Sequence, residues 1–239
     1  MCLVWFLTLI GAGGDYNYSK IDELSSLCAE KIGIISFTEA KLSNGIANDH
    51  KLSIPGYLPL IRADRNRHGG GVGVYVIKGL PCIHKSNLEI PGIEMICLEI
   101  KTRHTKLLYF TIYRPRTYDI VDFCDALQDF NDNVSGLYDG LIYVGDYNCH
   151  NNQWCQDDIT DREGGILKTT FDHCNYSQLI TEPTRYGALG RPACLDLIFT
   201  NLPTGHFKQK FYLFFLPLIA VRLVLSPTYT IAKMPPLHA

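Results

Sequence analysis

The sequence predicts an α/β sandwich built on mixed or antiparallel β-sheets. Its 239 residues are enough to bury a substantial core, and one domain is the default at this length. Short apolar runs with the length and composition of strands recur along the chain, and only a few segments have helical periodicity. This mixture indicates helices packed on sheets.

In the first half of the chain, one predicted helix precedes a series of strands. Apolar residues at helical spacing predict a helix from Lys20 to Lys31. A buried strand follows over residues 32–37 and ends at Thr38-Glu39. Further strands are expected over 57–63, 72–77, 93–101 and 106–113, the last two as a hairpin.

The second half mixes helices and strands more evenly. Thr117 or Asp119 can cap a helix that runs to about Asn133. A strand is predicted over 141–144, a short helix over 165–175, and late strands over 177–180 and 195–199.

The two ends differ in composition from the rest of the chain. We divide it into an atypical apolar leader (1–19), a central domain (20–205) and an atypical apolar tail (206–239). The leader resembles the hydrophobic part of a signal peptide but lacks its basic start. In the tail, residues 211–225 are almost wholly apolar but shorter than the about 20 residues of a membrane span. A weak membrane segment and a non-native end of the gene are both open interpretations of this tail.

Charge and cysteine content narrow the class of protein. The net charge of −2 excludes the strongly basic balance of a non-specific nucleic-acid binder, so contacts with nucleic acid must come from local patches. The nine cysteines form an odd set, and several lie inside apolar runs such as 95–98. Buried, reduced thiols are therefore expected, which predicts an intracellular protein.

The tetrapeptide Gly-Asp-Tyr-Asn at 145–148 is the most informative motif, because it ends an apolar strand. Residues two apart on a strand point to the same side, so Asp146 and Asn148 face one spot. A carboxylate can take a proton from water or hold a metal, and an amide can donate to a phosphate oxygen. That pairing suits phosphoester hydrolysis, although an ordinary Asp/Asn turn has the same composition.

Three other strand ends carry candidate residues. Glu39 is either a metal ligand or a solvated strand terminus. The hydroxyl of Tyr113 and the charge of Arg114 can contact a phosphate, although the proline that follows them also explains a simple strand stop. Asp196 stands in an apolar strand, where a carboxylate is costly unless a His, Arg or hydroxyl pairs with it. Because α/β sheets place their sites at strand ends, these residues predict one site.

Six motifs follow one another in a specific order: Thr38-Glu39, the glycine-rich run 69–76, Tyr113-Arg114-Pro115, the tetrapeptide 145–148, Thr-Glu-Pro-Thr-Arg at 181–185 and Leu-Asp-Leu-Ile-Phe-Thr-Asn at 195–201. This order resembles the endonuclease/exonuclease/phosphatase family over residues 20–205. The last two motifs select the branch encoded by non-LTR (LINE-type) retrotransposons. The resemblance implies a four-layered α/β sandwich of two mixed β-sheets flanked by helices. It also implies a nuclear enzyme that hydrolyses phosphodiester bonds of DNA with Mg²⁺ (or Mn²⁺).

The resemblance implies a role for each candidate residue. Glu39 would be the metal ligand, and Asp146 would orient or deprotonate the attacking water. Asn148 would hold the site together and contact the phosphate, and Tyr113 would contact a phosphate oxygen. Asp196 would orient a histidine. The substrate-binding candidates are Arg114, Thr184 and Arg185.

Two elements of the family pattern are not found. An asparagine motif is expected near Gly13, and Asn17 lies too close to the predicted helix to match it. A terminal Ser-Asp-His should supply the histidine for Asp196, but only His206 and His238 follow residue 205, and no aspartate precedes either of them. We therefore expect an endonuclease domain truncated at both ends, without the reverse transcriptase of its parent element and with little activity.

Two other functions remain open on the sequence. The same fold can serve a phosphoinositide-type phosphatase, with Arg62, Arg65, Arg67 and His68 beside the triple glycine to hold phosphates. A catalytically silent binding or membrane-associated protein is the third interpretation, and it rests on residues 211–225 and the missing histidine.

Overall fold

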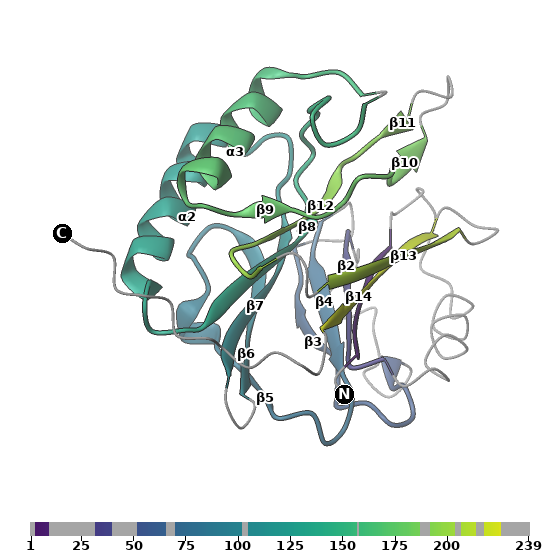
Figure 1. The fold of residues 1–239 in the computed structure, drawn as a ribbon. Helices are drawn as coiled ribbons and strands as arrows, with labels where there is room; N and C mark the ends of the chain where they lie inside the picture. The colour runs from purple at the N-terminus through teal and green to yellow at the C-terminus, as the bar shows by residue number, and fades with distance from the viewer. Residues whose placement is uncertain are drawn as a thin grey trace.

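Two stacked layers of β-sheet form the centre of the molecule, and two helices cover the outer face of the larger sheet (Figure 1). The computed structural model describes residues 3–9, 32–39, 52–65, 70–101, 105–156, 158–186, 192–203, 207–213 and 218–225. The strands over 3–9, 207–213 and 218–225 are described for the backbone. The helix predicted over 20–31 lies outside the described residues.

The larger sheet has six strands and is mixed. In spatial order they are β5 (Cys82–His84), β6 (Glu94–Lys101), β7 (Lys106–Tyr113), β8 (Gly140–Asp146), β12 (Asp196–Thr200) and β9 (Ser177–Gln178). Only β7 and β8 run parallel, and the other neighbours are antiparallel. The parallel pair is joined by helix α2 (Ile120–Val134), as a parallel crossover requires.

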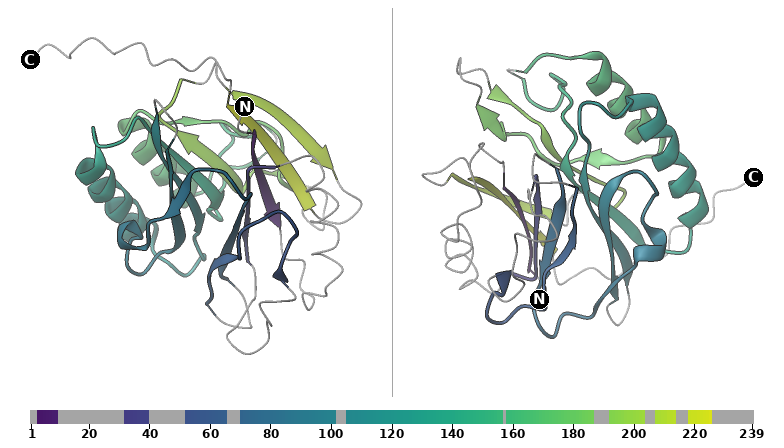
Figure 2. Two further views of the ribbon diagram at one scale, coloured as in Figure 1. Left: turned by 90° about the horizontal axis from the view of Figure 1, so that it is seen from below. Right: turned by 180° about the vertical axis from the view of Figure 1, so that it is seen from behind.

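The second layer consists of two three-stranded sheets. One has the order β2 (Ile34–Thr38), β4 (Val72–Val76) and β3 (Ile61–Ala63). The other has the order β1 (Leu3–Leu9), β14 (Leu218–Leu225) and β13 (Phe207–Leu213), so the two ends of the chain pair with each other. Strand β1 lies beside β2, which brings the two small sheets into one layer (Figure 2).

Aspartate side chains cap both helices. Asp119 accepts hydrogen bonds from the amides of Val121 at 2.7 Å and Asp122 at 3.3 Å, so it is the cap of α2 rather than Thr117. Asp161 accepts from the amide of Gly164 at 2.6 Å, and α3 (Arg162–His173) begins three residues earlier than predicted because of this cap. No helix among the described residues has the length and apolar character needed to cross a bilayer.

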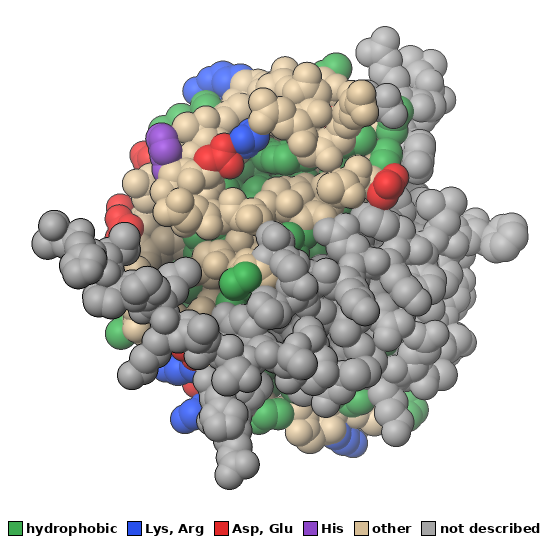
Figure 3. All heavy atoms as spheres, in the orientation of Figure 1, with side chains coloured by type: hydrophobic (Ala, Val, Ile, Leu, Met, Phe, Trp, Pro, Cys, Tyr) green, Lys and Arg blue, Asp and Glu red, His purple; other side chains and the backbone are tan. Residues whose placement is uncertain are grey.

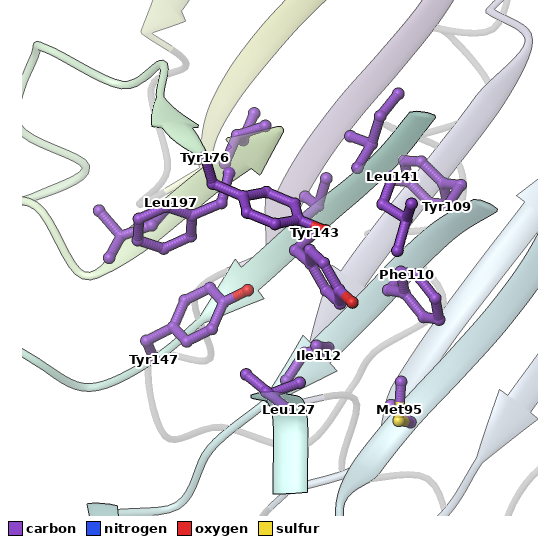
Figure 4. Packing of buried hydrophobic residues seen from close by; sticks show 14 of the residues in the cluster. Met95, Tyr109, Phe110, Ile112, Leu127, Leu141, Tyr143, Tyr147, Tyr176 and Leu197 are labelled. Atoms are coloured by element: carbon purple, nitrogen blue, oxygen red, sulfur yellow. The ribbon is translucent and has the colours of Figure 1, made fainter. Parts of the chain in front are cut away.

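The two faces of the larger sheet differ in chemistry. Aromatic rings fill the helix-covered face, where Phe110 stacks on Tyr143 at 4.5 Å between centroids (Figure 4). Polar contacts tie the other face to the second layer: the hydroxyls of Ser36 and Tyr109 lie 2.6 Å apart, and Thr111 donates to Ser36 at 2.9 Å. Residues at period two from Thr111 on β7 therefore point toward the second layer.

The predicted sandwich of two β-layers is confirmed, and most strand predictions match observed strands. The hairpin of β6 and β7 and the helix after β7 lie where the sequence places them. Three short strands were not predicted: β5, β10 (Arg185–Tyr186) and β11 (Pro192–Ala193). They have two or three residues each, too few to show a periodic pattern. Residues 211–225 fall largely within β13 and β14, and the predicted domain boundaries stay a prediction.

Candidate active site

Three predicted site residues and one further acid form a row across the larger sheet. Tyr113 of β7 pairs with Asp146 of β8, and Asp146 pairs with Asp196 of β12. On the other side, Glu94 of β6 pairs with Tyr113. Paired residues on neighbouring strands share a face of the sheet. Thr111 lies on this same face and donates a hydrogen bond to Ser36 of the second layer, so the row faces that layer. The row lies at one end of the sheet because β7 and β8 end there while the antiparallel β6 and β12 begin there.

Glu39 reaches this row from the second layer. It follows β2, and its carboxylate Oε1 accepts a hydrogen bond of 2.8 Å from the hydroxyl of Tyr113. Its backbone has φ +52°, a left-handed conformation that is uncommon for a residue with a side chain. Strained conformations persist where surrounding contacts hold them, and they cluster at functional sites.

Asp146 and Asn148 form a compact turn at the end of β8. The amide of Asn148 donates to Asp146 Oδ1 at 2.8 Å, and the side-chain amide of Asn148 donates to the carbonyl of Arg114 at 3.0 Å. Asn148 also has a left-handed backbone, with φ +50°. Gly145, which directly precedes Asp146, has no room for a side chain, since a Cβ there would lie 1.7 Å from the carbonyl oxygen of Ile112. The Asp/Asn turn that the sequence left open is thus formed, and it joins Asn148 to Asp146 just after β8 ends.

The carboxylates at the site raise one another's pKa. The pKa of Asp146 is raised from its ordinary value of 3.8 to about 7, mainly by burial. The charge of Glu39 contributes to this rise, and the hydrogen bond from Asn148 opposes it. Burial also holds the pKa of Asp196 well above its usual range, and the charge of Asp146 adds to this effect. Burial and the bond to Glu39 raise the pKa of Tyr113. At neutral pH, Asp146 is therefore poised between its acidic and basic forms.

Asp196 is incompletely paired. It is buried, and its Oδ1 has no hydrogen-bond partner among the described residues. The hydroxyl of Thr184 accepts from the backbone amides of Leu195 and Asp196 at 3.1 Å each, and a side-chain hydrogen bond with Thr184 stabilises the charged form of Asp196. Thr184 is 1 % exposed, so the structure places it as a support for Asp196 rather than at the surface.

Arg114 lies beneath the site. It is 1 % exposed, and its guanidinium donates to the carbonyls of Tyr147 at 2.8 Å, Tyr118 at 2.7 Å and Asn148 at 3.3 Å. These bonds hold the loop after β8 against the start of the segment that leads to α2. The structure therefore gives this residue a positioning role, whereas the sequence predicted contact with substrate.

Two exposed arginines supply positive charge at the row. Arg185 and Arg116 both favour the charged form of Asp146, and Arg185 does so for Asp196 as well. Arg116 was not among the predicted residues, although it follows the Tyr-Arg-Pro motif directly. On the described part of the face in Figure 3, Lys and Arg side chains are scattered and form no continuous patch. Local arginines at the row are thus the clearest sites for contact with an anion.

The arginines of the glycine-rich region are paired with acids. Arg62 Nε lies 3.5 Å from Asp64, and Arg65 Nη1 lies 3.3 Å from Glu94. Arg67 and His68 lie outside the described residues. The phosphate-holding cluster suggested by the sequence is therefore, for its described half, engaged in ion pairs.

The donor set of the row suits a hard divalent cation. Glu39, Asp146 and Asp196 present oxygen ligands, and a cation would offset the repulsion that raises the pKa of the two aspartates. The buried Oδ1 of Asp196 is an acceptor that has no hydrogen-bond donor among the described residues, so it is also free to bind a cation. Mg²⁺ takes one or two carboxylates and keeps several waters, so Glu39 with one neighbour is sufficient. No cluster of three His, Cys, Asp or Glu side chains placed to enclose a metal occurs among the described residues.

Solved structures share this fold at low sequence identity. The endonuclease domain of TRAS1, a telomere-specific non-LTR retrotransposon, matches with a TM-score of 0.70 and 14 % identity over 93 % of this chain and 99 % of that domain. The AP endonuclease LMAP from Leishmania major matches with a TM-score of 0.72 and 13 % identity over 94 % of this chain and 88 % of its own. The 3′ phosphatase NExo from Neisseria, bound to product DNA hairpin, matches with a TM-score of 0.67 and 13 % identity over 93 % of this chain and 99 % of its own. At these identities the likeness shows the fold.

Sequence comparison gives a more specific assignment. No curated protein sequence matches the chain significantly. A family model described as endonuclease-reverse transcriptase matches residues 107–212, which include Tyr113, Asp146 and Asp196. This matched segment of the chain resembles the endonuclease-reverse transcriptase family. The family resemblance inferred from the motif order is thereby confirmed.

The fold brings together five of the predicted residues: Glu39, Tyr113, Asp146, Asn148 and Asp196. Sequence reasoning missed Glu94, because a charged residue at the start of a predicted strand is ordinary. Only the strand register places it opposite Tyr113.

Proposed function

We propose that the chain is a phosphodiester hydrolase of duplex DNA that uses Mg²⁺ (or Mn²⁺), of the type encoded by non-LTR retrotransposons. The observation that carries this proposal is the meeting of Glu39 with the row Tyr113, Asp146 and Asp196. One layer supplies a carboxylate for the cation, and the other supplies a base and a phenol. The family-model match and the fold shared with the TRAS1 endonuclease domain support the choice of branch.

Asp146 is the group that takes the proton from the attacking water in this proposal. A general base works best when its pKa lies near the operating pH, and the pKa of Asp146 is about 7. The Asn148 amide fixes one oxygen of that carboxylate through the 2.8 Å bond, so the other oxygen is held in a defined direction. The proton moves from water to Asp146 as the water oxygen attacks phosphorus and the bond to the leaving oxygen breaks.

Glu39 would hold the cation, and Tyr113 would orient Glu39 through the 2.8 Å hydrogen bond. When bound, the cation supplies charge neutralisation on the phosphate oxygens, which is the main demand of phosphoryl transfer. Arg116 and Arg185 are exposed beside Asp146 and would contact the backbone phosphates. Such charge-assisted contacts give affinity without reading base sequence.

A second part of the proposal concerns rate. Oδ1 of Asp196 is buried with no partner among the described residues, where the family pattern expects a histidine. A general acid or base contributes roughly 10²–10⁴-fold to a rate. We therefore propose that turnover is low, because no histidine pairs with Asp196 among the described residues.

Nicking of supercoiled plasmid by the purified chain tests the proposal. We expect slow, Mg²⁺-dependent conversion to the open circle, reduced at least about 10²-fold by Asp146→Asn and by Glu39→Gln. Glu99→Gln is the matched control, because Glu99 lies on β6 but faces Tyr138 and Lys106 at the other end of the strand. Nicking that survives chelation and both site variants would contradict the hydrolytic mechanism.

Two further outcomes separate the alternatives. Hydrolysis of inositol phosphates in preference to duplex DNA would favour the phosphatase interpretation. An absence of turnover on either substrate would favour the silent binding protein. A rate equal to that of the TRAS1 endonuclease domain would overturn the proposal of low turnover.

A further inference from the structure

Glu94 is an acid of the row that the proposed chemistry does not use. It begins β6 and pairs with Tyr113 in the register of the larger sheet. Its Oε2 accepts a hydrogen bond of 2.6 Å from the backbone amide of Gly71, and its Oε1 lies 3.3 Å from Arg65 Nη1. Both partners belong to the second layer, so this one carboxylate connects the two layers.

The two partners of Glu94 adjoin strands β4 and β3, and β4 pairs with β2, the strand that Glu39 follows. Gly71 directly precedes Val72, and Val72 pairs with Thr38 on β2, the residue before Glu39. On its other side, Val72 pairs with Ala63 on β3, two residues before Arg65. Glu94 therefore ties the larger sheet to the point where all three strands of the small sheet end or begin.

The backbone around this carboxylate is shaped to receive it. Gly70 has φ +78°, and a Cβ there would lie 2.7 Å from Glu94 Oε2 and 2.7 Å from Arg65 Cδ. Glycine favours this left-handed conformation, and a side chain here would have to displace Glu94 or Arg65. The glycines at 70 and 71 therefore allow the turn to approach the carboxylate of Glu94 closely.

Electrostatics are consistent with a carboxylate held by these contacts. Burial raises the pKa of Glu94, while the bond from Gly71 and the charge of Arg65 act in the opposite direction. The charge of Glu39 is close enough to raise the pKa of Glu94 as well. The two glutamates thus face the same end of the site from opposite layers.

We propose that Glu94 is a positioning residue that holds the end of β2, and with it Glu39, over Tyr113. The left-handed backbone of Glu39 needs contacts that keep it in place, and the bond from Tyr113 restrains only its side chain. Glu94 supplies the backbone restraint through Gly71 and Val72. The proposal rests on the proposed function in so far as Glu39 holds the cation, but the restraint itself does not depend on a metal.

Hydrogen exchange of the metal-free chain tests the restraint directly. In Glu94→Ala we expect the amide of Gly71 and the amides of residues 36–39 to exchange on the order of tenfold faster than in the unchanged chain, because a bond to a charged acceptor is lost. Glu94→Gln retains an oxygen that can accept from Gly71, so it should restore most of the protection. Glu99→Gln, at the far end of the same strand, should leave these amides unchanged. Unchanged exchange in Glu94→Ala would overturn the proposal.

Mn²⁺ titration followed by electron paramagnetic resonance tests the consequence for the cation. Loss of a residue that orients a metal ligand commonly weakens binding 10–100-fold, so we expect roughly a tenfold loss in Glu94→Ala and a smaller one in Glu94→Gln. Equal losses in both variants would show that the charge of Glu94 acts alone and would overturn its positioning role. If the unchanged chain binds no Mn²⁺, the metal part of the proposed function fails, while the exchange measurement still decides the role of Glu94.

Discussion

The hydroxyl of Tyr113 donates a 2.8 Å hydrogen bond to the carboxylate of Glu39, and this bond joins the two β-layers at the candidate site. The two residues are 74 positions apart in sequence and come from sheets that share no strand. Their contact determines whether a carboxylate from one layer stands over the aspartates of the other. Substitution of Tyr113 by phenylalanine removes this bond.

Tyr113→Phe should lower the free energy of unfolding by about 1 kcal/mol, since the buried Tyr113 loses one bond to a charged acceptor. It should also weaken Mn²⁺ binding, because the Glu39 carboxylate loses its orientation. Urea unfolding and metal titration measure the two effects. Tyr138→Phe is the matched control, as its hydroxyl donates to Glu99 at 3.0 Å at the other end of the sheet. Equal effects of both variants on metal affinity would refute the special role of Tyr113.

The raised pKa of Asp146 predicts how stability depends on pH. The pKa is about 7 in the folded chain against 3.8 ordinarily, so the folded state binds more protons between these values. Stability associated with this group is therefore present below about pH 4 and is lost as the pH rises through 7. The loss amounts to at most about 4 kcal/mol, because each unit of pKa corresponds to roughly 1.4 kcal/mol.

Asp146→Asn removes this loss. In metal-free buffer, its melting temperature should exceed that of the unchanged chain by more at pH 8 than at pH 5. Thermal unfolding with a chelator at both pH values provides the measurement. Asp125→Asn, on the exposed face of α2, should show no such difference. Parallel pH profiles for Asp146→Asn and the unchanged chain would argue against ionisation of a buried Asp146.

Asp146 and Asp196 should show coupling in a double-mutant cycle. Each charge disfavours the other, since the charge of Asp146 is a cause of the raised pKa of Asp196. At pH 8 without metal, Asp196→Asn should stabilise the chain, and less so when Asp146→Asn is already present. A coupling free energy on the order of 1 kcal/mol is expected for such contacting residues. Additive effects of the two substitutions on the free energy of unfolding would contradict the coupling.

Substitutions of Arg114 and Arg116 should affect different properties: that of Arg114 the stability of the fold, and that of Arg116 the binding of DNA. Arg114→Ala removes a buried guanidinium and leaves three backbone carbonyls without this donor, so we expect a loss of about 3 kcal/mol or more in the free energy of unfolding. Arg116 is exposed, and Arg116→Ala should change stability by less than about 0.5 kcal/mol. Urea unfolding compares the two variants.

Fluorescence anisotropy with a labelled duplex completes the comparison. Arg116→Ala should weaken DNA binding and reduce its salt dependence, because one phosphate contact is lost. Binding of duplex that is unaffected by Arg116→Ala would remove this residue from the proposed DNA contact.

The strands and helices of the larger sheet were largely predictable because their signals are local. The apolar runs of β6, β7 and β8 are long enough to predict buried strands, and Asp119 is a typical capping residue at the start of α2. The short β10 and β11 carry no comparable signal, since they exist only through pairing with each other. Strand ends were less certain than strand centres, as the start of α3 at Arg162 shows.

The candidate residues themselves were determined by the sequence, because Glu39, Tyr113, Asp146, Asn148 and Asp196 each stand at a strand end where chemistry can be exposed. The tertiary structure decided what each one touches. Register set Asp146 between Tyr113 and Asp196 and brought Glu94 into the row. Burial directed Arg114 inward onto backbone carbonyls and left Asp196 Oδ1 without a partner among the described residues. The physical reason is that residue type limits what a side chain can do, whereas pairing between distant strands determines its neighbours, its solvation and hence its pKa.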